Sequence, residues 1–399
     1  MKLTFEETQP RQVVHVHKRV DGPWFWTRYS AHPYVGCRSG CTFCYLRGGH
    51  YLGKRDPATF DTLIQVKTNV VERLRFELSR LERDVLACGD WQQPAEDRYR
   101  LSRQMLEVAH ELSFPVFIVE RSPLLERDLD LLKALSRRSW VGVVLSFSNL
   151  SPGLKAAFEP RSPGLQRRLQ CMERLASAGI LVGASLMPII PFVGDDTAHL
   201  DEAVRMTAAH GGRFVLGAGM SMEGTQAALT WEAAGKLDPE LPERWRKLYG
   251  TEPDGTPSSS APREYKARLG QRVRELCERH GLLSRMPRYI PDGPLAVNKW
   301  VAERLFLRCW ELDLELASPS RVWAYRKAAW TVDVLPRSLV DIHQQQPGTG
   351  LRRLPEMSEV VARDIERWLL EWPARRKERV RATSPSTLGP LFDAPEEKP

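Results

Sequence analysis

Short runs of apolar and β-branched residues alternate with longer segments of helical period over roughly the first half of the chain. Strands are predicted at 30–34, 84–88, 115–119, 140–148, 180–187 and 213–217. Helices are predicted at 66–81, 101–112, 125–135, 165–178 and 198–210. Because strands of nearly continuous hydrophobicity are buried on both faces, this pattern indicates a parallel sheet that is covered by helices.

Six strand–helix units in series predict an α/β fold, and specifically a partial (βα)6 TIM-like barrel with functional residues at the carboxyl ends of its strands. A doubly wound open sheet is the alternative. It is disfavoured because no Gly-rich dinucleotide-binding pattern follows the first strand. From Asn298 onward the pattern is helical, which predicts an all-α C-terminal domain.

The chain has 399 residues, more than one domain usually holds, so several domains are expected. We predict an N-terminal extension (1–25), a barrel domain (26–235), an extension with a linker rich in Pro, Ser and Gly (236–294), a helical domain (295–373) and a tail that is first basic and then disordered (374–399).

The charge balance is mildly basic, with 58 Lys and Arg against 50 Asp and Glu, a net charge of +8 and a pI near 9.2. This balance fits a polyanionic partner, and it also fits the composition of a GC-rich genome. The sequence contains no apolar run of signal-peptide or membrane-span length. Seven cysteines, three of them clustered, do not form a secreted disulfide framework. We therefore expect a cytoplasmic protein with no membrane contact.

The clustered cysteines, Cys37, Cys41 and Cys44, form a C-x3-C-x2-C run with an aromatic residue before the last cysteine. A closed zinc site or an ordinary electron-transfer cluster has four protein ligands, whereas this loop supplies three. The pattern therefore favours a [4Fe–4S] cluster in which one iron stays open to another ligand. A zinc site with Cys88 as its fourth ligand is the alternative.

The cysteine run resembles the signature of the radical S-adenosylmethionine (SAM) superfamily, and in particular its spore photoproduct lyase-like branch. Further segments resemble motifs of that branch in the same order along the chain. They lie at 90–96, 120–130, 146–148, 158–160 and 168–169. Together with the cysteine run, the resemblance covers about residues 25 to 220.

This resemblance implies that Cys37, Cys41 and Cys44 hold three irons and that SAM chelates the fourth. The reduced cluster would then cleave SAM to methionine and a 5′-deoxyadenosyl radical, which abstracts a hydrogen atom from the substrate. The cofactors supply the difficult chemistry, while the barrel shields and aims the radical. An external one-electron reductant of the flavodoxin or ferredoxin type is implied as a partner.

Four residues at predicted strand ends are candidates for binding SAM. Arg121, where the branch usually has lysine, is suited to a bidentate contact with the SAM carboxylate, and a surface salt bridge is its alternative role. Asp90 is a candidate for the amino group or the ribose. Ser146 and Ser148 are candidates for the ribose, with capping of the barrel rim as their alternative role.

Two further residues are candidates for catalysis. Cys88 is expected at the end of the second strand, facing the barrel mouth, where it resembles the cysteine with which photoproduct lyases return a hydrogen atom. Its alternative role is that of a small core residue. Tyr45 is expected to relay a hydrogen atom or to pack beside the cluster. His15 and His17 would share one face of an extended segment, but no further metal ligand stands near them.

The C-terminal region resembles the helix-hairpin-helix domain of X-family DNA polymerases. Its hairpin turn at 354–358 lacks the usual glycines, and Glu356 puts a negative charge where a phosphate would lie. Phosphate contacts are therefore expected from other side chains, with Ser358 as a helix N-cap. The nucleic-acid candidates are Arg321, Arg326, Lys327, Arg352, Arg353 and Ser358. A helical packing domain without DNA contact is the alternative.

These features together predict a radical SAM enzyme that acts on DNA, with photoproduct-lyase-like lesion repair as the concrete case. The sequence leaves two alternatives open. One is radical SAM modification of RNA or protein, and the other is a non-catalytic iron–sulfur protein that binds nucleic acid.

Overall fold

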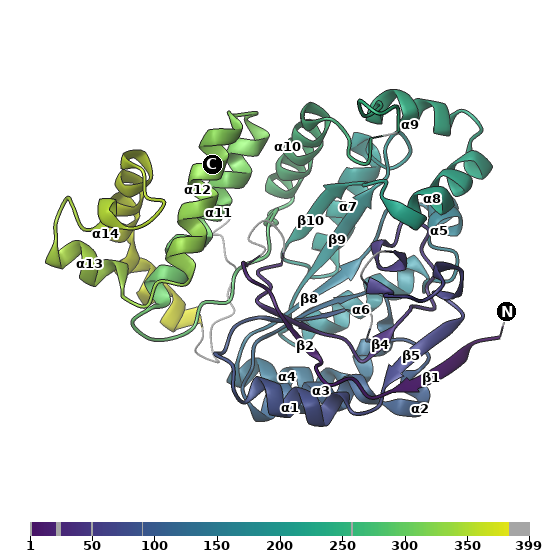
Figure 1. Ribbon diagram of the computed structural model, residues 1–399, viewed down its shortest axis with the longest axis horizontal. Coiled ribbons are helices and arrows are strands. Elements are labelled where there is room, and N and C mark those ends of the chain that lie inside the picture. Colours follow the sequence, from purple (N-terminus) through teal and green to yellow (C-terminus); the bar gives the residue numbers. More distant parts are fainter. Residues whose placement is uncertain (1, 21–24, 49–50, 90, 257, 383–399) are drawn as a thin grey trace, which may run out of the picture. The chain divides into compact units, whose positions relative to one another are not determined.

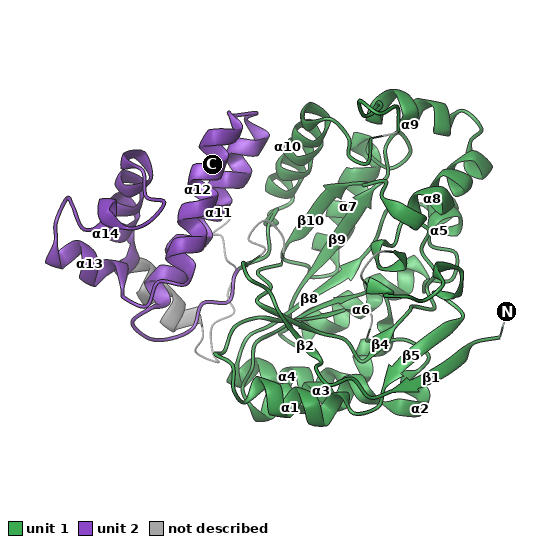
Figure 2. Ribbon diagram, in the orientation of Figure 1, with its two compact units in different colours: residues 1–287 green, residues 288–399 purple. Residues whose placement is uncertain are grey.

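The computed structural model describes residues 2–20, 25–48, 51–89, 91–256 and 258–382, without the side chains of 374–382. The chain divides into two compact units, residues 1–287 and residues 288–399 (Figure 2). The segment 236–294, which the sequence suggested as an extension and linker, contributes two helices to unit 1.

Unit 1 is built on a seven-stranded sheet with the order β10-β9-β8-β7-β6-β3-β2. Its strands are β2 (Val14–Val16), β3 (Tyr29–Ala31), β6 (Leu86–Gly89), β7 (Val116–Glu120), β8 (Val141–Ser146), β9 (Leu181–Ile189) and β10 (Val215–Gly219). From β3 to β10 every pairing is parallel, and β2 joins the edge in antiparallel orientation. The predicted parallel α/β sheet is therefore confirmed, while its closure into a partial barrel stays a prediction.

Ten α-helices are described in unit 1. They are α1 (Val70–Leu78), α2 (Glu96–Tyr99), α3 (Leu101–Glu111), α4 (Leu129–Arg138), α5 (Pro152–Phe158), α6 (Leu165–Ser177), α7 (Thr197–Ala209), α8 (Gly224–Leu237), α9 (Leu241–Tyr249) and α10 (Arg263–Arg279). Figure 1 shows α1, α3 and α4 along one side of the sheet. Short 3-10 turns include η1 (Tyr45–Arg47), η3 (Pro57–Thr59) and η4 (Pro123–Asp128).

A second, smaller sheet has the order β1-β5-β4 and was not predicted. It consists of β1 (Thr4–Thr8), β5 (Leu63–Lys67) and β4 (Tyr34–Val35). The predicted helix at 66–81 is wrong at its start, because β5 occupies those residues. In β5, Ile64 and Val66 are both 0% exposed, and they alternate with less buried neighbours as a strand requires.

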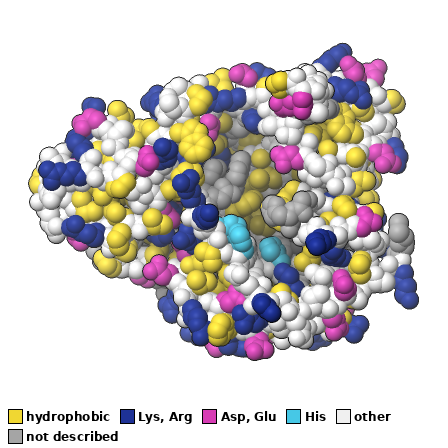
Figure 3. All heavy atoms as spheres, in the orientation of Figure 1, with side chains coloured by type: hydrophobic (Ala, Val, Ile, Leu, Met, Phe, Trp, Pro, Cys, Tyr) yellow, Lys and Arg dark blue, Asp and Glu magenta, His cyan; other side chains and the backbone are white. Residues whose placement is uncertain are grey.

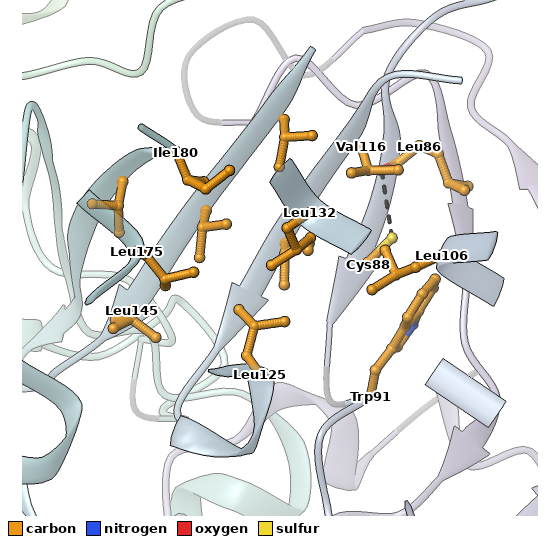
Figure 4. Close-up of a cluster of buried hydrophobic side chains, with 14 of the residues drawn as sticks. Leu86, Cys88, Trp91, Leu106, Val116, Leu125, Leu132, Leu145, Leu175 and Ile180 are labelled. Carbon is orange, nitrogen blue, oxygen red and sulfur yellow. Dashed lines mark hydrogen bonds between the residues drawn. The ribbon is translucent and has the colours of Figure 1, made fainter. Parts of the chain in front are cut away.

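The main sheet has one face that is covered by helices. Leu86 and Cys88 lie on this face, in one hydrophobic core with Leu106 of α3 (Figure 4). Because side chains alternate along a strand, the residues between them lie on the opposite face, which we call the inner face. Ala87 and Ser146 belong to the inner face by this alternation. Polar residues at the strand ends of the inner face are therefore placed for function.

Unit 2 contains α11 (Ala296–Leu314), α12 (Pro319–Asp333), α13 (Leu339–Gln345), the 3-10 turn η5 (Leu351–Arg353) and α14 (Glu359–Ala382). Helix α11 packs against α12 and α14. The buried Asn298 of α11 donates to Leu335 O at 3.1 Å and to Arg337 O at 2.8 Å, and it accepts from Leu339 N at 2.9 Å. One amide thereby fixes the connection between α12 and α13. Across both units, none of the described helices is long and apolar enough to cross a bilayer.

Candidate functional site

The three clustered cysteines lie on one folded loop directly after β4. Cys37 N donates to Phe60 O at 3.0 Å, and Cys44 N donates to Cys41 O at 3.4 Å. Gly36 adopts φ of +96°, and a Cβ atom there would lie 2.7 Å from Phe60 O. The loop therefore requires glycine at this position, because a side chain would collide with the neighbouring backbone. Cys41 is buried, and the other two thiols are partly exposed.

A buried arginine is hydrogen-bonded to the backbone of this loop. The side chain of Arg47 donates through Nε to Cys41 O at 3.1 Å, and its Nη2 lies 3.5 Å from Asp61 Oδ2. Burial lowers the pKa of Arg47, while the charges of Cys44, Cys41 and Cys37 act in the opposite direction. Arg47 therefore places a positive charge close to the three cysteines of the loop.

The three cysteines of this loop are the predicted ligands of an iron–sulfur cluster. Among the described residues, no group of three or more His, Cys, Asp or Glu side chains is placed to hold one metal ion. In a [4Fe–4S] cluster each thiolate binds a different iron, so the thiolates need not converge on one point. Three thiols on one loop, all near Arg47, match that requirement, although the ligand assignment stays a prediction.

A buried carboxylate lies at the ends of two central strands. Glu159, directly after α5, is 1% exposed and accepts from Arg168 Nη2 at 2.7 Å and from Ser148 N at 3.0 Å. The hydroxyl of Ser148 also donates to Glu159, and Ser162 Oγ donates to it at 3.0 Å. We call Glu159, Arg168, Ser148, Ser162 and Arg121 the Glu159 network.

Arg121, the first residue after β7, connects the Glu159 network to the cysteine loop. Its Nε lies 3.4 Å from Glu159 Oε2, and its guanidinium lies 5.5 Å from the ring centroid of Phe43. Burial acts to raise the pKa of Glu159, but Arg121 and Arg168 outweigh it and hold the pKa at about 2. Because Glu159 stays ionised, it keeps Arg121 beside the cysteine loop. Thr42 N, which donates to Phe158 O at 3.0 Å, adds a backbone link.

The other predicted SAM-binding residues have different surroundings. Ser146 lies on the inner face, and its carbonyl accepts from Arg168 Nη1 at 2.7 Å. Ser148 is 2% exposed and donates its hydroxyl to Glu159, which matches the structural role that was its alternative. Tyr45 is 59% exposed, and its ring meets the edge of Tyr51 at a centroid distance of 5.1 Å. Asp90 lies outside the described residues.

The expected orientation of Cys88 is wrong. The residue lies at the carboxyl end of β6, as predicted, but it is 1% exposed and shares the helix-covered face with Leu86. Its Sγ donates to Leu86 O at 3.7 Å, and burial, followed by the charge of Glu120, raises the pKa of the thiol. The alternation of side chains along the strand turns the thiol away from the inner face. It therefore packs as a core residue and does not face a substrate there.

The segment after β6 is held by buried carboxylates that the sequence alone did not single out. Glu120 is 5% exposed and accepts from Trp91 N at 2.7 Å and from Gln92 N at 3.0 Å. Glu96 is 0% exposed and accepts from Ser102 N at 2.9 Å and from Arg127 Nη2 at 2.8 Å. An acidic residue that ends or follows an apolar strand could have predicted these contacts, because a buried carboxylate needs hydrogen-bond partners from the neighbouring chain.

Three of the six predicted nucleic-acid residues in unit 2 make ion pairs within the unit. Arg352 pairs with Glu359 at 2.6 Å and Glu366 at 2.8 Å, Lys327 with Glu356 at 3.3 Å, and Arg326 with Asp313 at 3.4 Å. Arg353 is exposed and lies 3.3 Å from Gln346 Oε1. Ser358 Oγ accepts from Val361 N at 3.3 Å, so its predicted capping role is confirmed.

Arg321 lies instead at a cavity of about 630 Å³ between α11, α12 and α14. The charged residues that line the cavity are Arg304, Arg308, Arg321, Arg367, Glu311 and Asp364. Four cations against two carboxylates leave the lining with a net positive charge, and Tyr325 and Trp368 add aromatic surface. Three of these arginines pair with carboxylates of the same unit, Arg304 with Glu371, Arg308 with Glu311 and Arg367 with Asp364, and Arg321 adds a further cation to the lining.

Comparison with known proteins places these features in context. No family model matches the chain. An uncharacterized protein of Mycobacterium tuberculosis is 32% identical over 263 residues, which cover 64% of this chain and 75% of the relative. A radical SAM Nα-GlyT isomerase of Pseudomonas phage M6 is 28% identical over 242 residues, covering 58% of this chain and 45% of that protein.

Solved structures of spore photoproduct lyase variants share the fold of this chain. One variant has a TM-score of 0.52 at 15% sequence identity, covering 70% of this chain and 81% of the lyase. Another, with bound AdoMet and dinucleoside spore photoproduct, has the same TM-score, identity and coverage. At this identity the likeness concerns the fold alone.

Proposed function

We propose that this chain, which belongs to the same family as the uncharacterized mycobacterial protein and is related to the radical SAM superfamily, is a radical SAM enzyme that acts on DNA. The observation that carries the proposal is the loop with Cys37, Cys41 and Cys44, supported by one buried arginine and followed by the Glu159 network. These cysteines would hold a [4Fe–4S] cluster, with SAM at the remaining iron. Together the two cofactors supply one-electron cleavage of SAM and hydrogen-atom abstraction.

In this proposal, Arg121 binds the SAM carboxylate. Glu159 fixes one side of the guanidinium at 3.4 Å, and Phe43 of the cysteine loop lies next to its face. A carboxylate bound by arginine gains two parallel hydrogen bonds when the guanidinium is already oriented. Ser146 on the inner face is the candidate for the ribose. Asp90 keeps its proposed role at the amino group or the ribose, and Tyr45 its proposed role beside the cluster.

The proposal of DNA as the substrate is supported by the positive charge of the chain. The chain carries a net charge of +8, and Arg321 lies at the basic cavity of unit 2. Phosphate contacts from arginine supply the sequence-independent part of nucleic-acid affinity. Arg353 and Ser358 at the α14 end are the remaining proposed contacts. The reductant is proposed to be a flavodoxin- or ferredoxin-type protein, since the cluster needs one electron.

The experiment uses anaerobically reconstituted, reduced protein with SAM and UV-irradiated DNA. Release of thymine residues from photoproduct, followed by mass spectrometry, is the expected outcome for lesion repair. Undamaged DNA of the same sequence is the matched control. If 5′-deoxyadenosine forms while neither DNA changes, the radical SAM assignment survives and DNA is not the substrate.

A further inference from the structure

His15 of the edge strand β2 and His17, directly after it, lie toward the inner face of the sheet. Val14 lies in the hydrophobic core on the helix-covered face, and His15 pairs across the strands with Ser30. Since side chains alternate, His15 and His17 both lie on the face opposite to Val14. Ser30 shares that face, because its neighbour Tyr29 belongs to the core. Nothing in the proposed cofactor site uses these residues.

The histidines form a connected group. His17 Nε2 lies 3.1 Å from Ser30 Oγ, and the rings of His15 and His17 meet edge to face at a centroid distance of 4.6 Å. His32, directly after β3, places Nδ1 3.0 Å from Gly89 O, at the carboxyl end of β6. The group therefore extends from the edge strand β2 to the carboxyl end of β6, which precedes the proposed SAM-binding residue Asp90.

Basic residues outnumber acidic ones around this group, although the Glu77 carboxylate of α1 accepts hydrogen bonds from Val13 N at 3.2 Å and Val14 N at 2.9 Å. Residues 8–20 contain Arg11, Lys18 and Arg19 in addition to the two histidines, and no acidic residue. Arg28 donates to His17 O at 2.9 Å. Figure 3 shows histidine side chains on one face of the molecule. Such a concentration of cations attracts an anion and is relieved by binding one.

The titration of His17 agrees with this arrangement. Burial lowers the pKa of His17, and the charges of His15, Arg28 and His32 lower it further. The imidazole is therefore neutral in the free protein near pH 7. A phosphate placed beside it reverses the balance, because a negative charge favours the protonated form. Anion binding should thus take up protons and should strengthen as the pH falls.

We propose that His15, His17 and Ser30 bind a phosphodiester group of the polynucleotide substrate beside the edge strand β2. This inference rests on the proposed function and adds a substrate contact to it. A polynucleotide is favoured over a carboxylate ligand because the basic residues continue along the chain on both sides of the histidines. In this arrangement the β2 edge binds the phosphate backbone of the polynucleotide, and a base of the polynucleotide lies at the inner face of the sheet.

The test measures binding of a fluorescent single-stranded DNA to reconstituted full-length protein by anisotropy, at pH 6 and pH 8 and across a salt series. Wild-type affinity is expected to rise severalfold from pH 8 to pH 6. The double variant His15→Asn, His17→Asn should lose most of this rise, and its log-affinity against log-salt slope should fall by about 0.7 per lost phosphate contact. His17→Lys should bind the DNA at pH 8 about as tightly as the wild type does at pH 6, and its affinity should no longer depend on pH.

His199→Asn is the matched control, since His199 is an exposed histidine on α7 that pairs with Asp196. It should leave both the pH dependence and the salt slope unchanged. An RNA strand of the same length serves as the comparison that identifies the preferred polynucleotide. The inference is overturned if the double variant retains the wild-type pH dependence and slope, or if the wild type has no pH dependence. SAM cleavage by the wild type tests the proposed function separately.

Discussion

Replacing Glu159 by glutamine removes one buried negative charge and keeps the shape of the side chain. The carboxylate is 1% exposed, and its partner Arg168 is 0% exposed and lies 2.7 Å away. In the Glu159→Gln variant, Arg168 and Arg121 lose their shared counter-charge within the Glu159 network. Removing one partner of a buried ion pair costs about 3–5 kcal/mol of stability, because the other charge stays buried.

The pKa of Glu159 gives a second measure of the same effect. Its fall from 4.5 to about 2 corresponds to about 3.4 kcal/mol, since each pKa unit is worth about 1.36 kcal/mol. A depressed carboxyl pKa stabilises the folded state above the unfolded value of 4.5, and the contribution is lost as the pH falls toward 2. We therefore expect the free energy of unfolding of the Glu159→Gln variant to be about 3 kcal/mol lower than that of the wild type near neutral pH. This difference should become smaller below about pH 4.5.

Urea unfolding followed by circular dichroism measures this loss, and isothermal titration measures SAM affinity in the same variant. Because Glu159 orients Arg121, SAM affinity should fall by about tenfold, or about 1.4 kcal/mol. Glu126→Gln is the matched control. Glu126 pairs with Arg167 and Arg174, whose side chains are 41% and 63% exposed, so its loss should cost at most about 1 kcal/mol. Equal stability of the Glu159→Gln variant and the wild type at pH 7 would refute the reasoning.

Three further predictions concern single side chains. Cys88→Ala should lower the free energy of unfolding by about 1 kcal/mol through a small cavity while leaving 5′-deoxyadenosine and substrate products unchanged, and a changed product spectrum by mass spectrometry would contradict its placement in the core. Arg121→Ala should weaken SAM binding at least tenfold in titration calorimetry, whereas Arg121→Lys should restore most of it; equal affinities of all three proteins count against the carboxylate contact. Arg321→Ala should reduce the log-affinity against log-salt slope for duplex DNA by about 0.9, while Lys327→Ala, which removes a cation paired with Glu356, should change it less.

The sequence predicted the parallel sheet because its strands are buried runs whose pattern is local. The run at 180–187 and the strand β9 (Leu181–Ile189) differ by two residues at most. In contrast, β5 was missed because its alternation of apolar and polar residues is only five residues long and runs directly into a helical pattern, while its partners β1 and β4 are distant in the sequence. Its residues were instead assigned to the start of the helix that follows.

The orientation of Cys88 shows a second limit. A strand that is apolar on both faces does not reveal which set of alternate residues meets the helices, so the thiol was assigned to the wrong face. The Glu159 network shows a third limit. The sequence placed Arg121, Glu159 and Arg168 in separate motifs. Only the fold, which brings the end of β7, the end of α5 and the start of α6 together, reveals one shared ion-pair cluster.

Formation of 5′-deoxyadenosine tests the central claim most directly. Reconstituted wild-type protein, reduced by dithionite without oxygen and supplied with SAM, should produce 5′-deoxyadenosine in amounts that mass spectrometry can quantify. The Cys41→Ala variant should lose both bound iron and this product, while Cys309→Ala, which changes a buried cysteine of unit 2, should retain both. Absence of 5′-deoxyadenosine from wild-type protein that contains its full iron would contradict the assignment as a radical SAM enzyme.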